Sequence, residues 1–138
     1  MKIFTLIAAI LLFQPLAFSQ AQKNIVKSYP YNNTPAVILA VDGVVEIVEW
    51  DQKLVRLVTT IDAVNFNEAT LKALAEAGRY SCSYTESDQG SMILTMLKAQ
   101  RALTIRSVNI KEKYQFKIFV PKGVLVEQVN YDDVAAQF

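Results

Sequence analysis

Apolar and polar residues alternate along most of this chain, with a period of two. In 54–61 the odd positions share one face and Arg56 lies on the other. In 113–120 the even positions are apolar, and Phe119 is the one apolar exception among the odd ones. This alternation is typical of half-buried strands. Together with short apolar runs such as 36–41, it predicts strands over 36–41, 44–50, 54–61, 79–85, 92–97, 103–110, 113–120 and 124–129.

Turn-forming residues separate these strands and predict how they pair. The Asp42-Gly43 dipeptide between two apolar runs predicts a hairpin of 36–41 with 44–50. The turn 87–90 predicts a second hairpin, of 79–85 with 92–97. We expect 103–110 and 113–120 to form a third pair.

The chain has one strong helix pattern, over 67–77. Asn65 or Asn67 can cap its free N–H groups. Leu71, Leu74 and Ala75 form an apolar stripe at helical spacing, and Gly78 suits a left-handed terminating residue. One helix among many strands predicts a mainly β fold. The pattern leaves open an antiparallel-rich two-layer sandwich or the opening coils of a β-solenoid, and no fixed period favours the solenoid.

The N-terminus reads as an export signal. Lys2 precedes an apolar run over 3–13 that is too short to anchor in a bilayer, and Pro15 follows it. Cleavage is expected after Ser19 or Ala21. We therefore expect a signal peptide over 1–21, a flexible segment over 22–35, a single β-rich domain over 36–130 and a tail over 131–138.

Composition narrows the chemistry. The 138 residues contain no histidine and one cysteine. Histidine triads, zinc hydrolase motifs and most transition-metal sites are thereby excluded, and no intramolecular disulfide can form. Without Lys2 the basic and acidic residues balance at thirteen each, so nothing indicates nucleic acid as a partner. We expect no cofactor, no metal site and no catalytic residue.

The charges are unevenly distributed along the sequence. Nine acidic and four basic residues lie in 42–88, whereas seven basic residues and one acidic residue lie in 98–122. This predicts either an acidic end and a basic end, or a neutral surface if the two stretches fold side by side. The basic stretch could bind anionic envelope glycans, lipid head groups or the acidic end of a neighbouring molecule. Its candidate binding residues are Arg101, Arg106, Lys111, Lys113 and Lys117.

The single tryptophan, the single cysteine and the acidic pairs are further candidates for a site. Trp50 could offer a flat ring for sugar stacking, or it could simply pack at a strand edge. Cys82, in alternation with two tyrosines, is expected to be a small buried hydrophobe rather than a nucleophile. Acidic pairs for glycoside hydrolysis would be Glu46 with Glu49, or Asp51 with Asp62; the first pair lies three apart on a strand and so faces opposite sides.

Two stretches, DGVVEIVEWDQKLVRLVTT (42–60) and KYQFKIFVPKGVLVEQVN (113–130), resemble the exported adhesin-like β-solenoid proteins of Bacteroidetes, the head-GIN or auto-transporter-adhesin-like domains. The resemblance implies a short form or an N-terminal part of that family. It also implies a protein of the periplasm, the outer-membrane surface or the extracellular space. No motif of the family is catalytic.

Taken together, these features predict a non-enzymatic binding or scaffold domain of the cell envelope. The expected partner is envelope polysaccharide or another envelope protein, with no membrane span after signal cleavage, and the oligomeric state stays open. The alternative is a carbohydrate-active enzyme of the envelope, or its carbohydrate-binding module.

Overall fold

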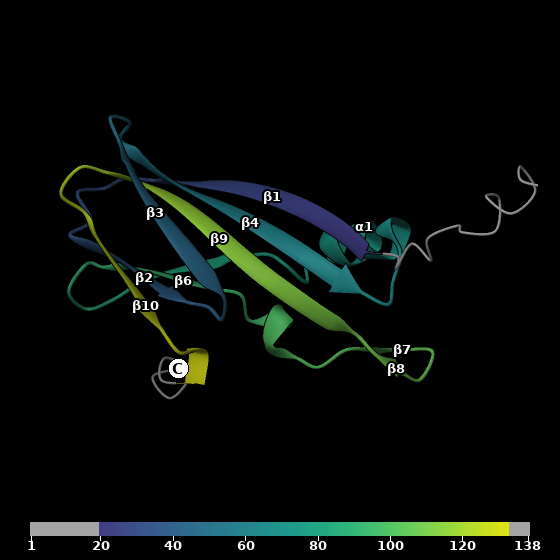
Figure 1. The fold of residues 1–138 in the computed structure, drawn as a ribbon. Helices are drawn as coiled ribbons and strands as arrows, with labels where there is room; N and C mark the ends of the chain where they lie inside the picture. Colours follow the sequence, from purple (N-terminus) through teal and green to yellow (C-terminus); the bar gives the residue numbers. More distant parts are fainter. Residues whose placement is uncertain (1–19, 133–138) are drawn as a thin grey trace, which may run out of the picture.

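The computed structural model describes residues 20–132, which form two four-stranded sheets, a small two-stranded hairpin and one α-helix (Figure 1). Sheet A contains the three longest strands and has the order β1-β4-β9-β3. Sheet B is made of short strands in the order β10-β2-β6-β5. Parallel and antiparallel pairs occur in both sheets. The mainly β fold with one helix is confirmed, and of the two architectures the two-layer sandwich fits.

The strands of sheet A are β1 (Gln20–Pro30), β4 (Leu54–Val64), β9 (Lys111–Pro121) and β3 (Val44–Trp50). The strands of sheet B are β10 (Leu125–Val129), β2 (Ala36–Ala40), β6 (Met92–Thr95) and β5 (Ser83–Glu86). The remaining elements are α1 (Glu68–Glu76), the 3-10 helix η2 (Lys98–Gln100), β7 (Thr104–Ile105) and β8 (Val108–Asn109).

The main core lies between the two sheets. On β4 the burial alternates without a break, so that every second side chain is buried. Burying these apolar side chains is the main stabilising term of such a sandwich. The core is formed by residues such as Leu57, Ile61, Phe116 and Ile118 of sheet A with Val37, Leu39, Met92 and Leu94 of sheet B.

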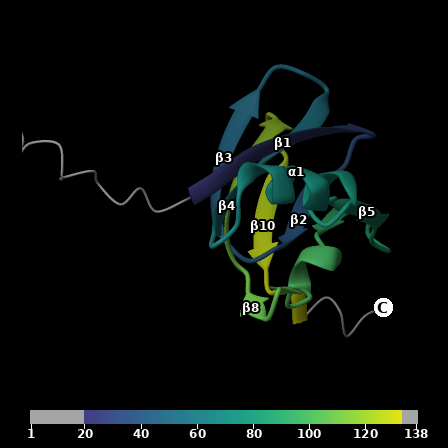
Figure 2. The same ribbon diagram turned by 90° about the vertical axis from the view of Figure 1, so that its right-hand side faces the viewer.

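Helix α1 extends this core along sheet A. The helix packs against β1 (Figure 2). Its Leu71 side chain belongs to the same buried cluster as Ala21 and Ala63. As predicted, the helix begins after an asparagine cap: the Asn67 side chain accepts a hydrogen bond from the Thr70 N–H at 2.8 Å. It ends at Glu76, and Gly78, with φ +85°, follows the C-cap in a backbone motif that satisfies the last carbonyls.

The Asp42-Gly43 hairpin prediction is wrong. β2 belongs to sheet B and β3 to sheet A, so the chain crosses between layers at this turn. β3 pairs instead with β9, in parallel, and β2 pairs in parallel with β10 and β6. Gly43 suits the crossing because its φ is +149° and an added Cβ would lie 2.5 Å from the Tyr114 carbonyl oxygen.

Three other predicted segments differ from the structure. Residues 22–30 are not flexible but belong to β1, an edge strand that buries Ala21 and Tyr29 and turns its polar side chains to solvent. Within 79–85 only the last residues are in a strand. Residues 103–110 do not pair with β9; they fold back as the β7–β8 hairpin. The predicted signal and tail fall mostly on 1–19 and 133–138, outside the described residues.

The acidic and basic stretches do not form separate ends. β9, which carries the central lysines of the basic stretch, lies between β4 and β3 of the acidic stretch. Lys113 is therefore the cross-strand neighbour of Asp62, and Lys117 that of Glu46. Within residues 20–132, no helix is long and apolar enough to span a bilayer.

Candidate functional site

The face of sheet A that points away from sheet B carries the most distinctive group of exposed side chains. The strand registers place even positions of β1, β4 and β3 on it, together with odd positions of β9. On β4 these side chains are mostly half-buried, which fits a face without a second layer over it. We call this surface the outer face of sheet A.

An aromatic pair occupies one part of the outer face. The rings of Trp50 on β3 and Phe119 on β9 have their centroids 5.0 Å apart at an interplanar angle of 36°. The indole N–H donates to the Leu54 carbonyl at 2.9 Å, which fixes the orientation of the ring. The pair thus forms a rigid aromatic patch on a surface that also carries the exposed valines Val26, Val44 and Val64.

Two cations flank this patch. The Arg56 guanidinium lies 5.1 Å from the Trp50 ring centroid, and the Lys117 ammonium lies 5.4 Å from that of Phe119. Cation–π contacts at exposed sites contribute about 0.5–1 kcal/mol each. They hold positive charge at the rim of the aromatic patch. We call Trp50, Phe119, Arg56 and Lys117 the aromatic–cation cluster.

Polar side chains continue the outer face beyond this cluster. Thr60 donates to the Asn24 side chain at 2.8 Å, and the Gln22 amide donates to Asp62 at 2.8 Å. Arg56 also donates to the Ser28 hydroxyl at 3.3 Å. In such an arrangement the amides and hydroxyls can hydrogen-bond to the hydroxyls of a sugar chain, and the aromatic ring can stack on a sugar ring. The cations can pair with its carboxylates.

The structure brings together only part of the predicted site. Trp50 and Lys117 lie in the cluster, and Lys113 and Lys111 lie farther along β9 on the same face. Arg101 follows η2, where its backbone carbonyl accepts from Arg79 at 3.0 Å, and Arg106 lies in the β7–β8 turn. Neither arginine belongs to the cluster.

Sequence reasoning missed two members of the cluster. Arg56 is recognisable in the sequence only as a solvent-facing residue of a strand. Phe119 carries a clearer signal, because it is the one apolar residue on the polar side of an alternating strand. The parallel β3–β9 register places Phe119 beside Val48 and Trp50 beside Pro121, and no local pattern reveals that register.

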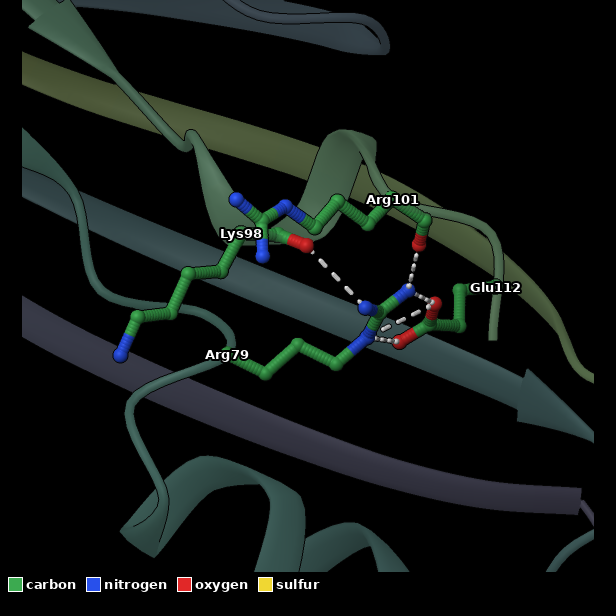
Figure 3. A network of polar contacts seen from close by, with 4 residues as sticks. All are labelled: Arg79, Lys98, Arg101 and Glu112. Atoms are coloured by element: carbon green, nitrogen blue, oxygen red, sulfur yellow. Dashed lines mark hydrogen bonds and ion pairs between the residues drawn. The ribbon is translucent and has the colours of Figure 1, made fainter. Parts of the chain in front are cut away.

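A second polar arrangement is buried near the β9 start (Figure 3). The Arg79 guanidinium forms an ion pair with Glu112, and it also donates to the carbonyls of Lys98 at 3.1 Å and Arg101 at 3.0 Å. The pair raises the pKa of Arg79, chiefly through its hydrogen bonds to Glu112. Both groups are thus satisfied within the protein, and the network ties the turn after α1 to η2 and β9.

Two tyrosines lie next to this network. The rings of Tyr80 and Tyr114 meet edge to face with centroids 6.2 Å apart. Burial raises the pKa of both hydroxyls, and the Glu112 carboxylate adds to the effect. Among residues 20–132 neither hydroxyl has a hydrogen-bond partner.

Cys82 is buried, as predicted for a core residue. Burial raises the pKa of its thiol, which disfavours the nucleophilic thiolate. Its carbonyl accepts hydrogen bonds from Tyr29 at 3.0 Å and Lys27 at 3.1 Å. The residue therefore contributes packing and a backbone acceptor.

The acidic pairs considered for hydrolysis do not converge. In the β3 register Glu46 lies on the outer face of sheet A, and Glu49 lies on the opposite side. Asp51 pairs with Lys122 at 3.3 Å, while Asp62 accepts from Gln22. In the described part of the chain no three acidic or cysteine side chains group in a way that could hold a metal ion.

Comparisons with known proteins add little. No family model matches the chain, and no curated protein matches it. A solved structure of a proposed cell adhesion protein from Clostridium sporogenes is similar over 78% of this chain and 45% of that protein, with 11% identity and a TM-score of 0.38. This chain thus spans less than half of that protein. The similarity is too low to support any conclusion on function.

Proposed function

We propose that the protein is an exported, non-enzymatic and adhesin-like binding domain of the cell envelope, whose outer face of sheet A binds an anionic polysaccharide. The observation that supports this most directly is the aromatic–cation cluster. A half-buried tryptophan held in place beside a second ring offers a stacking surface, and two cations at its rim favour acidic sugars.

The shape of the surface fits an extended ligand better than a small one. Strand β9 carries three lysines on the outer face, two or four positions apart: Lys111, Lys113 and Lys117. Side chains two residues apart on a strand are about 7 Å apart. A polymer with repeated carboxylates can therefore contact several lysines while one sugar ring stacks on the aromatic pair.

Titration of the purified protein with polygalacturonate, a polymer of acidic sugars, tests this proposal. Trp50 is the only tryptophan of the chain, so its fluorescence reports on the cluster alone. We expect a saturable change that weakens as ionic strength rises past about 0.15 M, where the Debye length is about 8 Å. A neutral glucan of similar length should bind more weakly.

Substitutions separate the cluster from general positive charge. Lys117→Gln should weaken binding several-fold. Trp50→Phe should remove most of the stacking surface while keeping an aromatic side chain in place; because this variant has no tryptophan, its binding is measured by isothermal titration calorimetry, as is that of the wild type for comparison. Lys72→Gln on α1 is the matched control, because its side chain is 70% exposed and lies outside the outer face. Equal losses in Lys117→Gln and Lys72→Gln, or no binding by the wild type, would contradict the proposal.

A further inference from the structure

The two edges of sheet A carry opposite charges. β1, at one edge, contains Lys23 and Lys27 and no acidic residue. β3, at the other edge, contains Glu46 and Glu49 and no basic residue. The edges of sheet B do not show this contrast, since β10 and β5 each carry one glutamate and no basic residue. Complementary edges are thus a property of sheet A.

Both edges also have backbone and apolar groups free for a partner. Within residues 20–132, β1 pairs only with β4 and β3 only with β9, and no further backbone hydrogen bond reaches either strand. Val26 on β1 is 60% exposed, and Val44 and Ile47 on β3 are 73% and 51% exposed. Exposed strands with apolar side chains are templates for the addition of another strand.

The directions of the two strands permit a simple repeat. β1 is antiparallel to β4, β4 is antiparallel to β9, and β9 is parallel to β3. β1 and β3 therefore run the same way. A second copy in the same orientation would place its β1 beside β3 as a parallel pair, which continues sheet A from one molecule to the next.

One register of this pair matches side chains on both faces. If Ile25 of the next copy lies beside Ile47, then Lys27 of that copy lies beside Glu49 and Val26 beside Val48. The Lys27 ammonium already donates to the Cys82 carbonyl at 3.1 Å, and its other protons remain available for a carboxylate. We infer that the protein associates head to tail with copies of itself through β3 of one molecule and β1 of the next.

Such a contact uses two different surfaces, so it does not close into a two-fold dimer and can add further copies. Sedimentation velocity of the purified protein tests it. The wild type should form species larger than dimers as concentration rises, most strongly near 0.01 M ionic strength, where the Debye length is about 30 Å. Glu49→Lys and Lys27→Glu should each weaken association about tenfold, because an attractive cross-strand pair becomes a repulsive one.

Mixing the two variants gives the decisive measurement. The Lys27→Glu protein keeps an intact β3 edge, and the Glu49→Lys protein keeps an intact β1 edge. An equimolar mixture should therefore assemble again into species larger than dimers, because the two substituted edges also carry opposite charges and attract each other. This recovery would also show that both variants are folded. Glu127→Lys on β10, an edge of sheet B, should assemble like the wild type.

Several results would overturn the inference. A wild type that is monomeric at low ionic strength and high concentration would do so, as would a mixture that stays monomeric. A Glu49→Lys protein that dimerises more strongly than the wild type would point to a two-fold β3–β3 contact instead. Binding of polygalacturonate depends on other residues, so its presence or absence leaves this outcome unaffected.

Discussion

Arg79 and Glu112, thirty-three positions apart, form an ion pair whose side chains are only 10% and 5% exposed. Two carbonyls complete the hydrogen bonding of the guanidinium, so the pair is satisfied in the folded state. Its formation requires α1, η2 and β9 to be in place together. The pair therefore links three elements that share little other contact.

Breaking this pair on one side should be costly. Arg79→Met leaves the Glu112 carboxylate buried without its partner, and we expect a loss of about 3–5 kcal/mol in the free energy of unfolding. Urea denaturation measures it. The double variant Arg79→Met, Glu112→Leu removes both charges and should recover much of the loss; a double variant as unstable as the single one would show that the loss came from packing.

The buried tyrosine hydroxyls should differ in how much each contributes to the free energy of unfolding. Tyr80→Phe removes a hydroxyl that has no partner among the described residues, so stability should stay within about 0.5 kcal/mol or rise. Tyr29→Phe removes a donor to the Cys82 carbonyl and should cost about 1–1.5 kcal/mol. Thermal unfolding of the two variants compares them directly. A clear loss in Tyr80→Phe would indicate an ordered water on its hydroxyl.

Alkaline pH should destabilise the protein. Burial raises the pKa of Tyr29, Tyr80 and Tyr114 above the ordinary value near 10. Above about pH 10 the unfolded chain releases these protons while the folded chain keeps them. Stability from these groups is thus intact below pH 10 and falls above it, by about 1.4 kcal/mol per pH unit for each. Urea midpoints between pH 8 and 11 measure the slope, which Tyr80→Phe should reduce.

The β7–β8 turn offers a stabilising change. Its central residues, Arg106 and Ser107, have φ of 51° and 66°, a conformation that favours asparagine and glycine. The variant Arg106→Asn, Ser107→Gly should raise the free energy of unfolding by about 1 kcal/mol. Gly90→Ala provides the opposite control, since Gly90 has φ +79° and should lose stability. A lower melting temperature in the first variant would refute the expectation.

The fold favours one of the two signal cleavage sites that the sequence predicts. β1 begins at Gln20, and Ala21 is 2% exposed and pairs with Ala63. Cleavage after Ala21 would remove a buried residue from the strand, whereas cleavage after Ser19 keeps all of the described part of β1. If the predicted signal is removed, mass spectrometry of the mature protein should therefore find Gln20 at its N-terminus. A terminus at Gln22 would show that β1 tolerates the loss.

Local patterns were sufficient for the strands with clean alternation and for the helix. β4 and β9 follow the predicted alternation, and α1 lies within the predicted range, with Asn67 and Gly78 at its ends. β1 was not predicted as a strand, because its polar outer face and its lysines resemble a loose segment in the sequence. Burial of Ala21 and Tyr29 depends on cross-strand partners more than twenty residues away, Ala63 and Val55.

Pairing between distant strands was beyond local reasoning. A turn such as Asp42-Gly43 suits a hairpin and a crossing between layers equally well, and here β3 pairs with the distant β9 instead of β2. The same holds for the aromatic–cation cluster, in which Trp50 and Phe119 meet because β3 and β9 are adjacent. Arg79 and Glu112 likewise lie in segments without any shared pattern.

The parallel pairs also bear on the order in which the molecule takes shape. β2 pairs with β10, and β3 with β9, so strands from the first half of the chain wait for partners from the last. Contacts this remote in sequence form slowly, because a long loop must close before any pairing energy is gained. During synthesis neither layer can be completed until β9 and β10 have emerged. The growing polypeptide therefore stays incompletely folded for most of that time.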